Sequence, residues 1–156
     1  MSTLTYRDAT PEDLPFIAAL GDADAVAAAR DPVRPGMADE QREALDAITA
    51  DPCHRLLVVE RDGEPVGSFQ LSFIPGVSRQ GAWRGQIESV RVVEHLRGQG
   101  IGEAMMRWAV ARCREKGCGV VQLTSDRQRE AAHRFYERLG FQPTHTGFKL
   151  KLVQSG

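Results

Sequence analysis

The chain has 156 residues, of which 42% are hydrophobic and 26% charged, and these proportions are typical of one globular domain. Because 20 lysines and arginines oppose 21 aspartates and glutamates, no net positive field attracts the protein to nucleic acid or an anionic membrane. No signal peptide or membrane-spanning segment is recognisable. Three irregularly spaced cysteines and scattered histidines favour free thiols in a reducing cytoplasm and no metal site.

Helices are expected to come first. The segment Thr10-Pro11-Glu12-Asp13 is typical of a helix start, with a threonine N-cap, a proline in the first turn and carboxylates facing the helix dipole. Apolar residues then follow at helical spacing, and an alanine-rich stretch over 22–29 is compatible with a continuation of this helix. A second helix is predicted over 38–49.

The pattern then changes to strands. Arg55 to Glu60 and 65–74 are predicted as a hairpin around Asp62-Gly63, and 82–93 as a long third strand. The elements expected after it are a glycine-rich loop over 97–102, a helix over 101–116, a strand over 119–124, a helix over 128–139 and a last strand over 147–152. This order predicts an α/β sandwich, with helices flanking a mixed, mostly antiparallel central sheet.

The loop Arg97-Gly98-Gln99-Gly100-Ile101-Gly102 runs from a strand directly into a helix. Glycines allow backbone amides to turn inward, and the unpaired first-turn N–H groups of a helix stabilise a pyrophosphate. The alternative is a plain turn with its arginine in solvent, which three glycines at alternate positions make less attractive. Glu103 excludes a Walker loop, which needs lysine there, and a dinucleotide fingerprint, which needs glycine or alanine.

Two segments resemble the GNAT superfamily of N-acetyltransferases. Arg97-x-x-Gly100-x-Gly102 matches the R/Q-x-x-G-x-G/A motif of that family, and 131–141, AAHRFYERLGF, resembles its later A-x-x-x-Y-E-x-x-G-F segment. The resemblance is clear over about 55–150. It implies one acetyltransferase domain over 1–156, with an acceptor-side helical region over about 1–52 and a sheet that binds acetyl-CoA over about 55–152.

The resemblance also implies how the coenzyme binds. Backbone groups near Val90, Arg91 and Val92 are expected to pair with the pantetheine arm like an added strand. The pyrophosphate is expected at the amides of Arg97, Gly98, Gln99, Gly100, Ile101 and Gly102. Phe135 and Ser125 complete the expected cofactor-binding set, although Ser125 and Asp126 stand where many relatives carry asparagine. Asp126 is equally suited to cap the next helix.

The reaction needs a base for the acceptor's ammonium group, and we predict Glu88. A carboxylate in a strand covered on both faces is costly unless it is paired, and relatives often carry glutamate there. The alternative is a structural ion pair with Arg84 or Arg91. A backbone N–H near Val90 is the expected oxyanion donor.

Tyr136 is the predicted acid for the departing thiolate, because it matches the family's tyrosine near the coenzyme sulfur. The alternative is a packing role, since Tyr136 lies on an apolar helical stripe. His133 is expected at the surface, Cys113 and Cys118 in packing roles, and Trp83 and Arg84 either at the acceptor site or simply at a strand edge.

The expected reaction is acetyl transfer from acetyl-CoA to a primary amine by direct attack, with a small molecule as the acceptor. The alternatives are a protein N-terminal or lysine acetyltransferase, and a non-catalytic acyl-CoA sensor. The acceptor pocket is expected to be built from the helices over about 23–50 and the loop over 73–83, and the resemblance makes a homodimer possible. Fold alone does not identify the acceptor.

Overall fold

The computed structural model describes residues 3–24 and 38–153. The chain divides into a first unit that ends at Leu123 and a C-terminal unit that begins at Thr124. Residues 25–29 of the expected helical continuation lie outside the described ranges.

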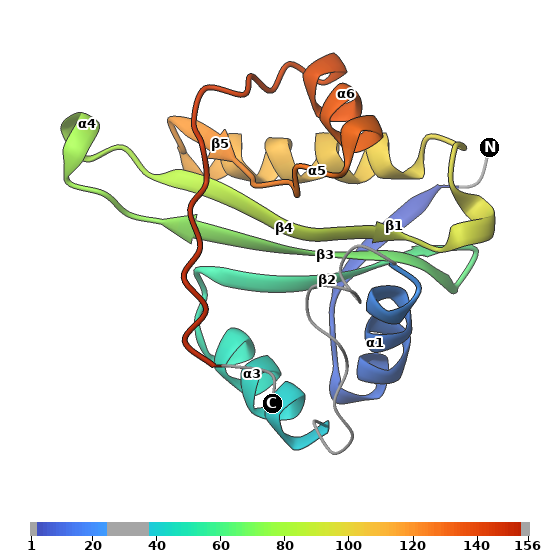
Figure 1. Ribbon diagram of the computed structural model, residues 1–156. Helices are drawn as coiled ribbons and strands as arrows, with labels where there is room; N and C mark the ends of the chain where they lie inside the picture. The colour runs from blue at the N-terminus through green and yellow to red at the C-terminus, as the bar shows by residue number, and fades with distance from the viewer. Residues whose placement is uncertain (1–2, 25–37, 154–156) are drawn as a thin grey trace. The chain divides into compact units, whose positions relative to one another are not determined.

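The first unit is built on one five-stranded sheet (Figure 1). Its strands lie in the order β1-β2-β3-β4-β5, and their bounds are Leu4–Asp8, His54–Arg61, Glu64–Ile74, Arg84–Val92 and Val120–Gln122. Neighbouring strands from β1 to β4 are antiparallel, whereas β5 runs parallel to β4. The predicted mixed, mostly antiparallel sheet with flanking helices is therefore confirmed.

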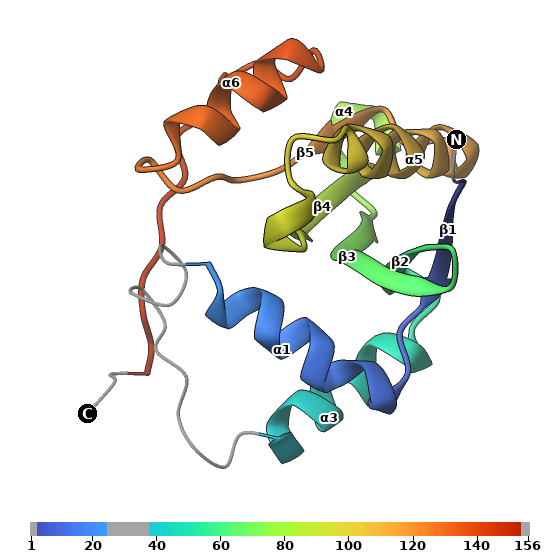
Figure 2. The ribbon, with the colours of Figure 1, turned by 90° about the vertical axis from the view of Figure 1, so that its right-hand side faces the viewer.

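Helices cover both faces of this sheet, with α5 on one face and α1 and α3 on the other (Figure 2). Their bounds are Leu14–Asp22 for α1, Ala38–Ala50 for α3 and Ile101–Lys116 for α5. Short turns complete the unit: 3-10 turns at Pro11–Asp13 and Glu94–Leu96, and α4 at Ser78–Gly81. The bounds of α5 match the prediction, and Gly117 ends this helix with a left-handed backbone, φ +86°.

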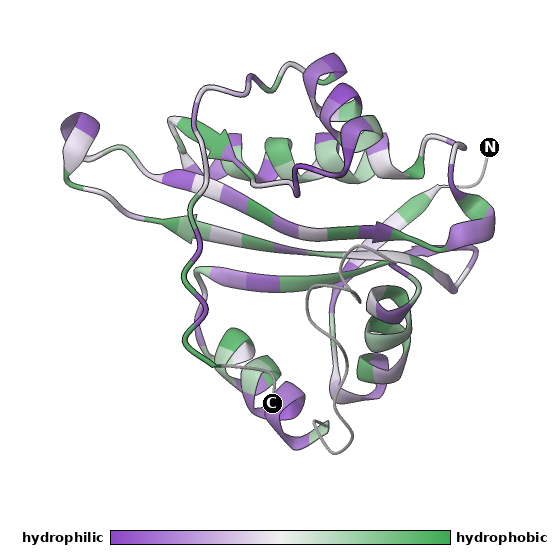
Figure 3. Cartoon of the chain, viewed as in Figure 1, coloured by the Kyte–Doolittle hydropathy of each residue, from purple (hydrophilic) through white to green (hydrophobic). Residues whose placement is uncertain are grey.

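Residues of β3 alternate between the two helical layers, because successive strand side chains point to opposite faces. Figure 3 shows hydrophilic and hydrophobic residues interspersed along this strand. Phe69 lies edge-on to Trp108 of α5, with ring centroids 6.0 Å apart, so the odd-numbered residues face α5. Ser68, Gln70 and Ser72 therefore face the α1 and α3 layer. On this same face, the buried apolar cluster is formed by Val58 of β2, Leu45 of α3 and Ala9.

Strand β1 was not predicted from the sequence, which indicated only helices before residue 55. Its pairing with β2 and the packing of Tyr6 stabilise it: the ring of Tyr6 stacks on Trp108 with centroids 4.5 Å apart. Leu4–Asp8 has only five residues and carries three polar side chains, so its local pattern is weak. Tertiary contacts, rather than intrinsic propensity, make this segment a strand.

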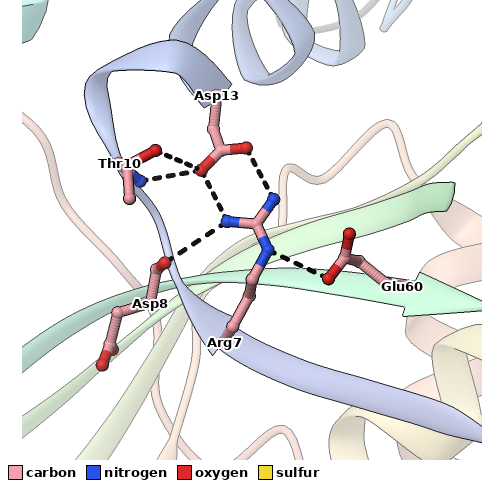
Figure 4. A network of polar contacts seen from close by, with 5 residues as sticks. All are labelled: Arg7, Asp8, Thr10, Asp13 and Glu60. Atoms are coloured by element: carbon pink, nitrogen blue, oxygen red, sulfur yellow. Dashed lines mark hydrogen bonds and ion pairs between the residues drawn. The ribbon is translucent and has the colours of Figure 1, made fainter. Parts of the chain in front are cut away.

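A network of ionic contacts joins β1 and β2 to the start of the helical layer (Figure 4). The guanidinium of Arg7 donates two hydrogen bonds to Asp13, of 2.7 and 2.8 Å, and a third of 2.9 Å to Glu60. Thr10 donates its backbone N–H to Asp13 at 2.7 Å, so the predicted helix start at Thr10 is confirmed. The pKa of Asp13 is lowered to about 2, chiefly by the hydrogen bond from Arg7.

The C-terminal unit contains α6, Glu130–Arg138, and Gly140 follows it with φ +97°. The strand expected over 147–152 is wrong, because the structure has irregular backbone there. Phe148, Leu150 and Leu152 alternate as in a strand but are 92%, 85% and 88% exposed. Alternation stabilises a strand only when a neighbouring strand accepts its hydrogen bonds, and the described part of this unit holds none.

Candidate active site

The glycine loop has the backbone that its composition predicted. Gly98 and Gly100 have left-handed φ values of +80° and +84°, and Gly100 immediately precedes the first residue of α5. A β-carbon at either glycine would meet no atom of the described residues within 4 Å, so the loop is open beside these positions. The N–H groups of the first turn of α5 have no partner within the helix and favour an anion.

The two polar side chains of the loop contact the ends of neighbouring strands. Arg97 donates from Nε to the carbonyl oxygen of Val92 at 3.3 Å, and Gln99 accepts from Arg61 at 3.4 Å. In this structure Arg97 therefore supports the turn from β4 into the loop. Phosphate binding by Arg97 stays a prediction.

Strand β4 continues beyond its parallel neighbour. The pairing of β4 with β5 runs from Arg84 to Gln86 only, although β4 extends to Val92. The backbone of Val90, Arg91 and Val92 thus lies beyond the last β5 partner, on the strand that leads to the glycine loop. An extended ligand could hydrogen-bond to this edge as an added neighbour of the strand, and pantetheine binding at Val90 to Val92 stays a prediction.

A β-bulge interrupts β4, and the sequence did not reveal it. Gln70 pairs with Glu88 and Ser68 with Arg91, so Ser89 and Val90 together oppose Phe69. Ser89 has a left-handed φ of +54°, which is unfavourable for a residue with a β-carbon. Serine carries no signal for this conformation, whereas a glycine would have suggested it. The bulge takes Ser89 and Val90 out of the regular ladder.

The bulge decides which side chains share a face. Glu88 and Arg91 are three residues apart, and in a regular strand they would point to opposite faces. Because they pair with Gln70 and Ser68, which share a face, both point towards the α1 and α3 layer. The expectation that Glu88 is covered on both sides is wrong: its side chain is exposed. None of the ion pairs among the described residues involves Glu88, and Arg91 instead contacts Asp24 at 3.5 Å.

Further polar groups lie on this face, and the sequence reasoning missed them. Gln122 of β5 donates to Gln86 of β4 at 2.9 Å. Ser72 is buried and shares a 2.8 Å hydrogen bond with His54 Nδ1. In the sequence these polar residues alternate with apolar ones along the strands. This pattern could have predicted a partly polar face, because a face that only packs against helices carries few polar groups. The β3–β4 part of this face is therefore suited to a polar ligand.

Other candidate residues lie elsewhere. Trp83 is on the α5 side, where the ammonium of Lys116 stands 4.6 Å from its ring centroid, so Trp83 packs against α5. Cys113 is buried, and burial raises the pKa of its thiol to about 12. The pKa of Cys118 is also raised by burial. Both thiols are poor nucleophiles at neutral pH, which agrees with a packing role.

In the C-terminal unit, Tyr136 packs between two aromatic rings. Its centroid lies 5.2 Å from that of Phe135 and 6.0 Å from that of Phe141. Burial raises the pKa of Tyr136, so its hydroxyl is protonated throughout the neutral range. Packing and an acid role are thus compatible in one side chain.

The loop before α6 offers a free hydroxyl. The Oγ of Ser125 is buried and has no hydrogen-bond partner in the described structure, which suits a contact to a ligand. Asp126 accepts from the N–H of Gln128 at 2.9 Å, and its carbonyl accepts from His133 at 2.7 Å. Asp126 therefore caps the turn that precedes α6 rather than the helix itself.

Among the described residues there is no cluster of three or more histidine, cysteine or acidic side chains that could hold a metal ion. No helix in the described ranges is both long and apolar enough to cross a membrane.

Comparisons with known proteins agree with this geometry. The acetyltransferase (GNAT) family matches residues 23–141. The chain is 32% identical to an aminoalkylphosphonate N-acetyltransferase of Salmonella typhimurium. The match extends over 107 residues and covers 69% of each chain.

Among solved structures, a transcriptional regulator from Bacillus halodurans C-125 is 37% identical, with a TM-score of 0.89 over 96% of this chain and 100% of that one. A predicted acetyltransferase from Clostridium acetobutylicum, solved with acetyl-CoA, is 18% identical and has the same fold, with a TM-score of 0.71 over 96% of this chain and 97% of that one. The chain therefore belongs to the acetyltransferase (GNAT) family of enzymes.

Proposed function

We propose that this enzyme transfers the acetyl group of acetyl-CoA to the primary amine of a small molecule by direct attack in a ternary complex. The observation that carries the proposal is the open glycine loop at the start of α5, directly after a β4 edge that extends beyond β5. This arrangement offers amides for a pyrophosphate and a strand edge for pantetheine. The relative that acts on aminoalkylphosphonates supports a small acceptor.

Cofactor binding is assigned to the elements that fit the coenzyme. The N–H groups from Arg97 to Gly102 bind the pyrophosphate, and the backbone of Val90 to Val92 pairs with the pantetheine arm. The unpartnered hydroxyl of Ser125 donates a hydrogen bond to the same arm. Phe135 packs against Tyr136 and supports its position.

The chemistry requires three groups. Glu88, directly or through one water, removes a proton from the acceptor's ammonium, and the free amine then attacks the thioester carbon. A backbone N–H of the bulge at Ser89 and Val90 stabilises the oxyanion. As the carbon–sulfur bond breaks, Tyr136 donates its phenolic proton to the thiolate of coenzyme A. The attacking nitrogen loses its second proton through water, which returns a proton to the phenolate and leaves a neutral amide. No acyl-enzyme is formed, so no cysteine takes part.

Isothermal titration calorimetry with acetyl-CoA tests cofactor binding, with dephospho-CoA and NAD as controls. We expect saturable one-to-one binding of acetyl-CoA and none of NAD. Thiol release is then measured with a panel of amines that includes 2-aminoethylphosphonate, polyamines, amino acids and aminosugars. Acetyl-CoA binding without release from any amine or peptide would indicate a sensor, and release with peptides alone a protein acetyltransferase. No binding at millimolar acetyl-CoA would overturn the proposal.

A further inference from the structure

The ion pair between Arg91 and Asp24 has an unusual geometry. Both side chains are largely buried, with exposed fractions of 21% and 10%. The closest approach is 3.5 Å, between Nε of Arg91 and a carboxylate oxygen of Asp24. This Nε is buried and has no hydrogen-bond partner among the described residues. A buried donor that is left unsatisfied costs free energy, and a buried charge costs more unless it is well hydrogen-bonded.

The same protein contains an arginine that only holds elements together. Arg7 makes two short hydrogen bonds to Asp13 and a third to Glu60, so its Nε and both terminal nitrogens are satisfied. A purely structural pair between β4 and the segment that follows α1 would be expected to resemble that one. The long contact at Arg91 instead leaves donor capacity for another anion.

The position of Arg91 indicates which anion. The bulge places Arg91 on the same face as Glu88. Their partners on β3 are two residues apart, so the α-carbons of Glu88 and Arg91 lie about 7 Å apart along the strand. A carboxylate for the acceptor's ammonium and a guanidinium thus stand side by side on this face. Together they match a short molecule that carries an amine at one end and an acid at the other.

We propose that Arg91 binds the oxyanion group, a phosphonate or carboxylate, of a zwitterionic amine acceptor, and that Asp24 holds the guanidinium when no acceptor is bound. This inference rests on the proposed function and narrows its substrate class. Guanidinium is suited to the task, because its donors match the spacing of carboxylate and phosphonate oxygens. Arg91 is a specificity-determining residue here, and its backbone retains its separate role at the pantetheine arm.

The test compares kcat/KM for three acceptors of similar size: 2-aminoethylphosphonate, β-alanine and propylamine. The variants are Arg91→Gln, Arg91→Lys and Asp24→Asn, with Arg114→Gln as a control because Arg114 is an exposed arginine in the last turn of α5. The quantity of interest is the preference for each zwitterion over propylamine. This ratio cancels changes in acetyl-CoA binding and in the fraction of folded enzyme.

We expect Arg91→Gln to lower the preference about 10-fold or more, because a charge-assisted hydrogen bond is lost. Arg91→Lys should restore part of it, and Asp24→Asn should keep or raise it, because the competing carboxylate is removed. Whichever of phosphonate and carboxylate loses more identifies the natural anion. An unchanged preference in Arg91→Gln, or a loss in Asp24→Asn as large as in Arg91→Gln, would show a structural tether and overturn the inference.

Failure of the proposed function is distinguishable from failure of this inference. If the wild-type enzyme acetylates no amine, titration of 2-aminoethylphosphonate and β-alanine into wild type and Arg91→Gln still measures anion binding directly. Binding by wild type that is lost in Arg91→Gln supports Arg91 as the anion site. Absence of binding by wild type, or equal binding by both proteins, contradicts it.

Discussion

A β-carbon on Gly85 would overlap the sulfur of Cys113, because β4 and α5 touch at this point. Replacing Gly85 with alanine should therefore destabilise the protein by about 1–3 kcal/mol, the usual cost of overpacking a core. The double variant Gly85→Ala with Cys113→Ala should recover part of the loss, since the two sites are directly coupled. Urea unfolding measures both.

Gly21 provides the matched control for that substitution. It lies in α1, and a β-carbon there would meet no atom within 4 Å in the part of the chain that the structure describes. Gly21→Ala should stabilise the protein by up to about 1 kcal/mol, because alanine favours helix more than glycine does. Equal effects of the two glycine substitutions would refute the crowding argument.

Stability should fall in acid through Asp13. Its folded-state pKa is about 2, below its ordinary value of 3.8, because Arg7 donates to its charged form. A lowered pKa contributes stability above the unfolded value, and this contribution is lost as the pH falls from about 4 to about 2. At neutral pH it amounts to at most about 2 kcal/mol.

The measurement is the free energy of unfolding of wild type and Asp13→Asn between pH 7 and pH 2.5. The difference between the two proteins should be largest at neutral pH and should shrink below pH 4. A difference that stays constant across this range would mean that Asp13 acts through its shape rather than its charge.

Glu88→Gln should lower kcat about 10²-fold or more, since general-base catalysis is removed, while the affinity for acetyl-CoA changes little. The defect should narrow as the pH approaches the pKa of the acceptor amine, because the amine then needs no base. Stopped assays from pH 7 to pH 10 test both points. Full activity of Glu88→Gln at pH 7 would remove Glu88 from the mechanism.

Tyr136→Phe keeps the ring against Phe135 and Phe141 and removes only the hydroxyl. We expect a clear loss of kcat with little change in the thermal unfolding midpoint, because the aromatic packing is retained. Since burial raises the pKa of Tyr136, wild-type activity should show no decline from phenol ionisation below pH 10. Equal kcat values for both proteins would leave Tyr136 a packing residue.

The bulge predicts different outcomes for two substitutions of Ser89. Its φ of +54° suits glycine and is strained for a β-branched residue. Ser89→Gly should leave stability nearly unchanged, whereas Ser89→Val should cost about 1–2 kcal/mol. Urea unfolding of the two variants checks the difference, and equal stabilities would argue against a left-handed backbone at this position.

The sequence was most informative where local chemistry decides the structure. The helix α5 has the predicted bounds because Gly100 and Gly117 fix its two ends by backbone conformation. The positions of β2, β3 and β4 were predicted to within about two residues, since their apolar patterns and the Asp62-Gly63 turn are local signals.

The sequence did not predict those features whose structure depends on residues distant in the chain. Strand β1 depends on β2 and on the ring of Trp108. The apolar alternation of Phe148 and Leu150 suggested a strand that has no pairing partner within its described unit. The contact between Asp24 and Arg91 depends on a bulge at a serine, because the bulge sets the face of Arg91, and the sequence holds no sign of it.

The bulge also changes which residues of β4 face α5. Before it, odd-numbered residues such as Gly85 face α5; after it, the even-numbered Val92 opposes Gly67 and takes that face. Deleting Ser89 would therefore straighten the strand while every remaining side chain keeps its original face. Point substitutions change side chains and backbone together. This single-residue deletion would keep the arrangement of the remaining side chains and remove only the backbone geometry of the bulge, so it separates the two contributions.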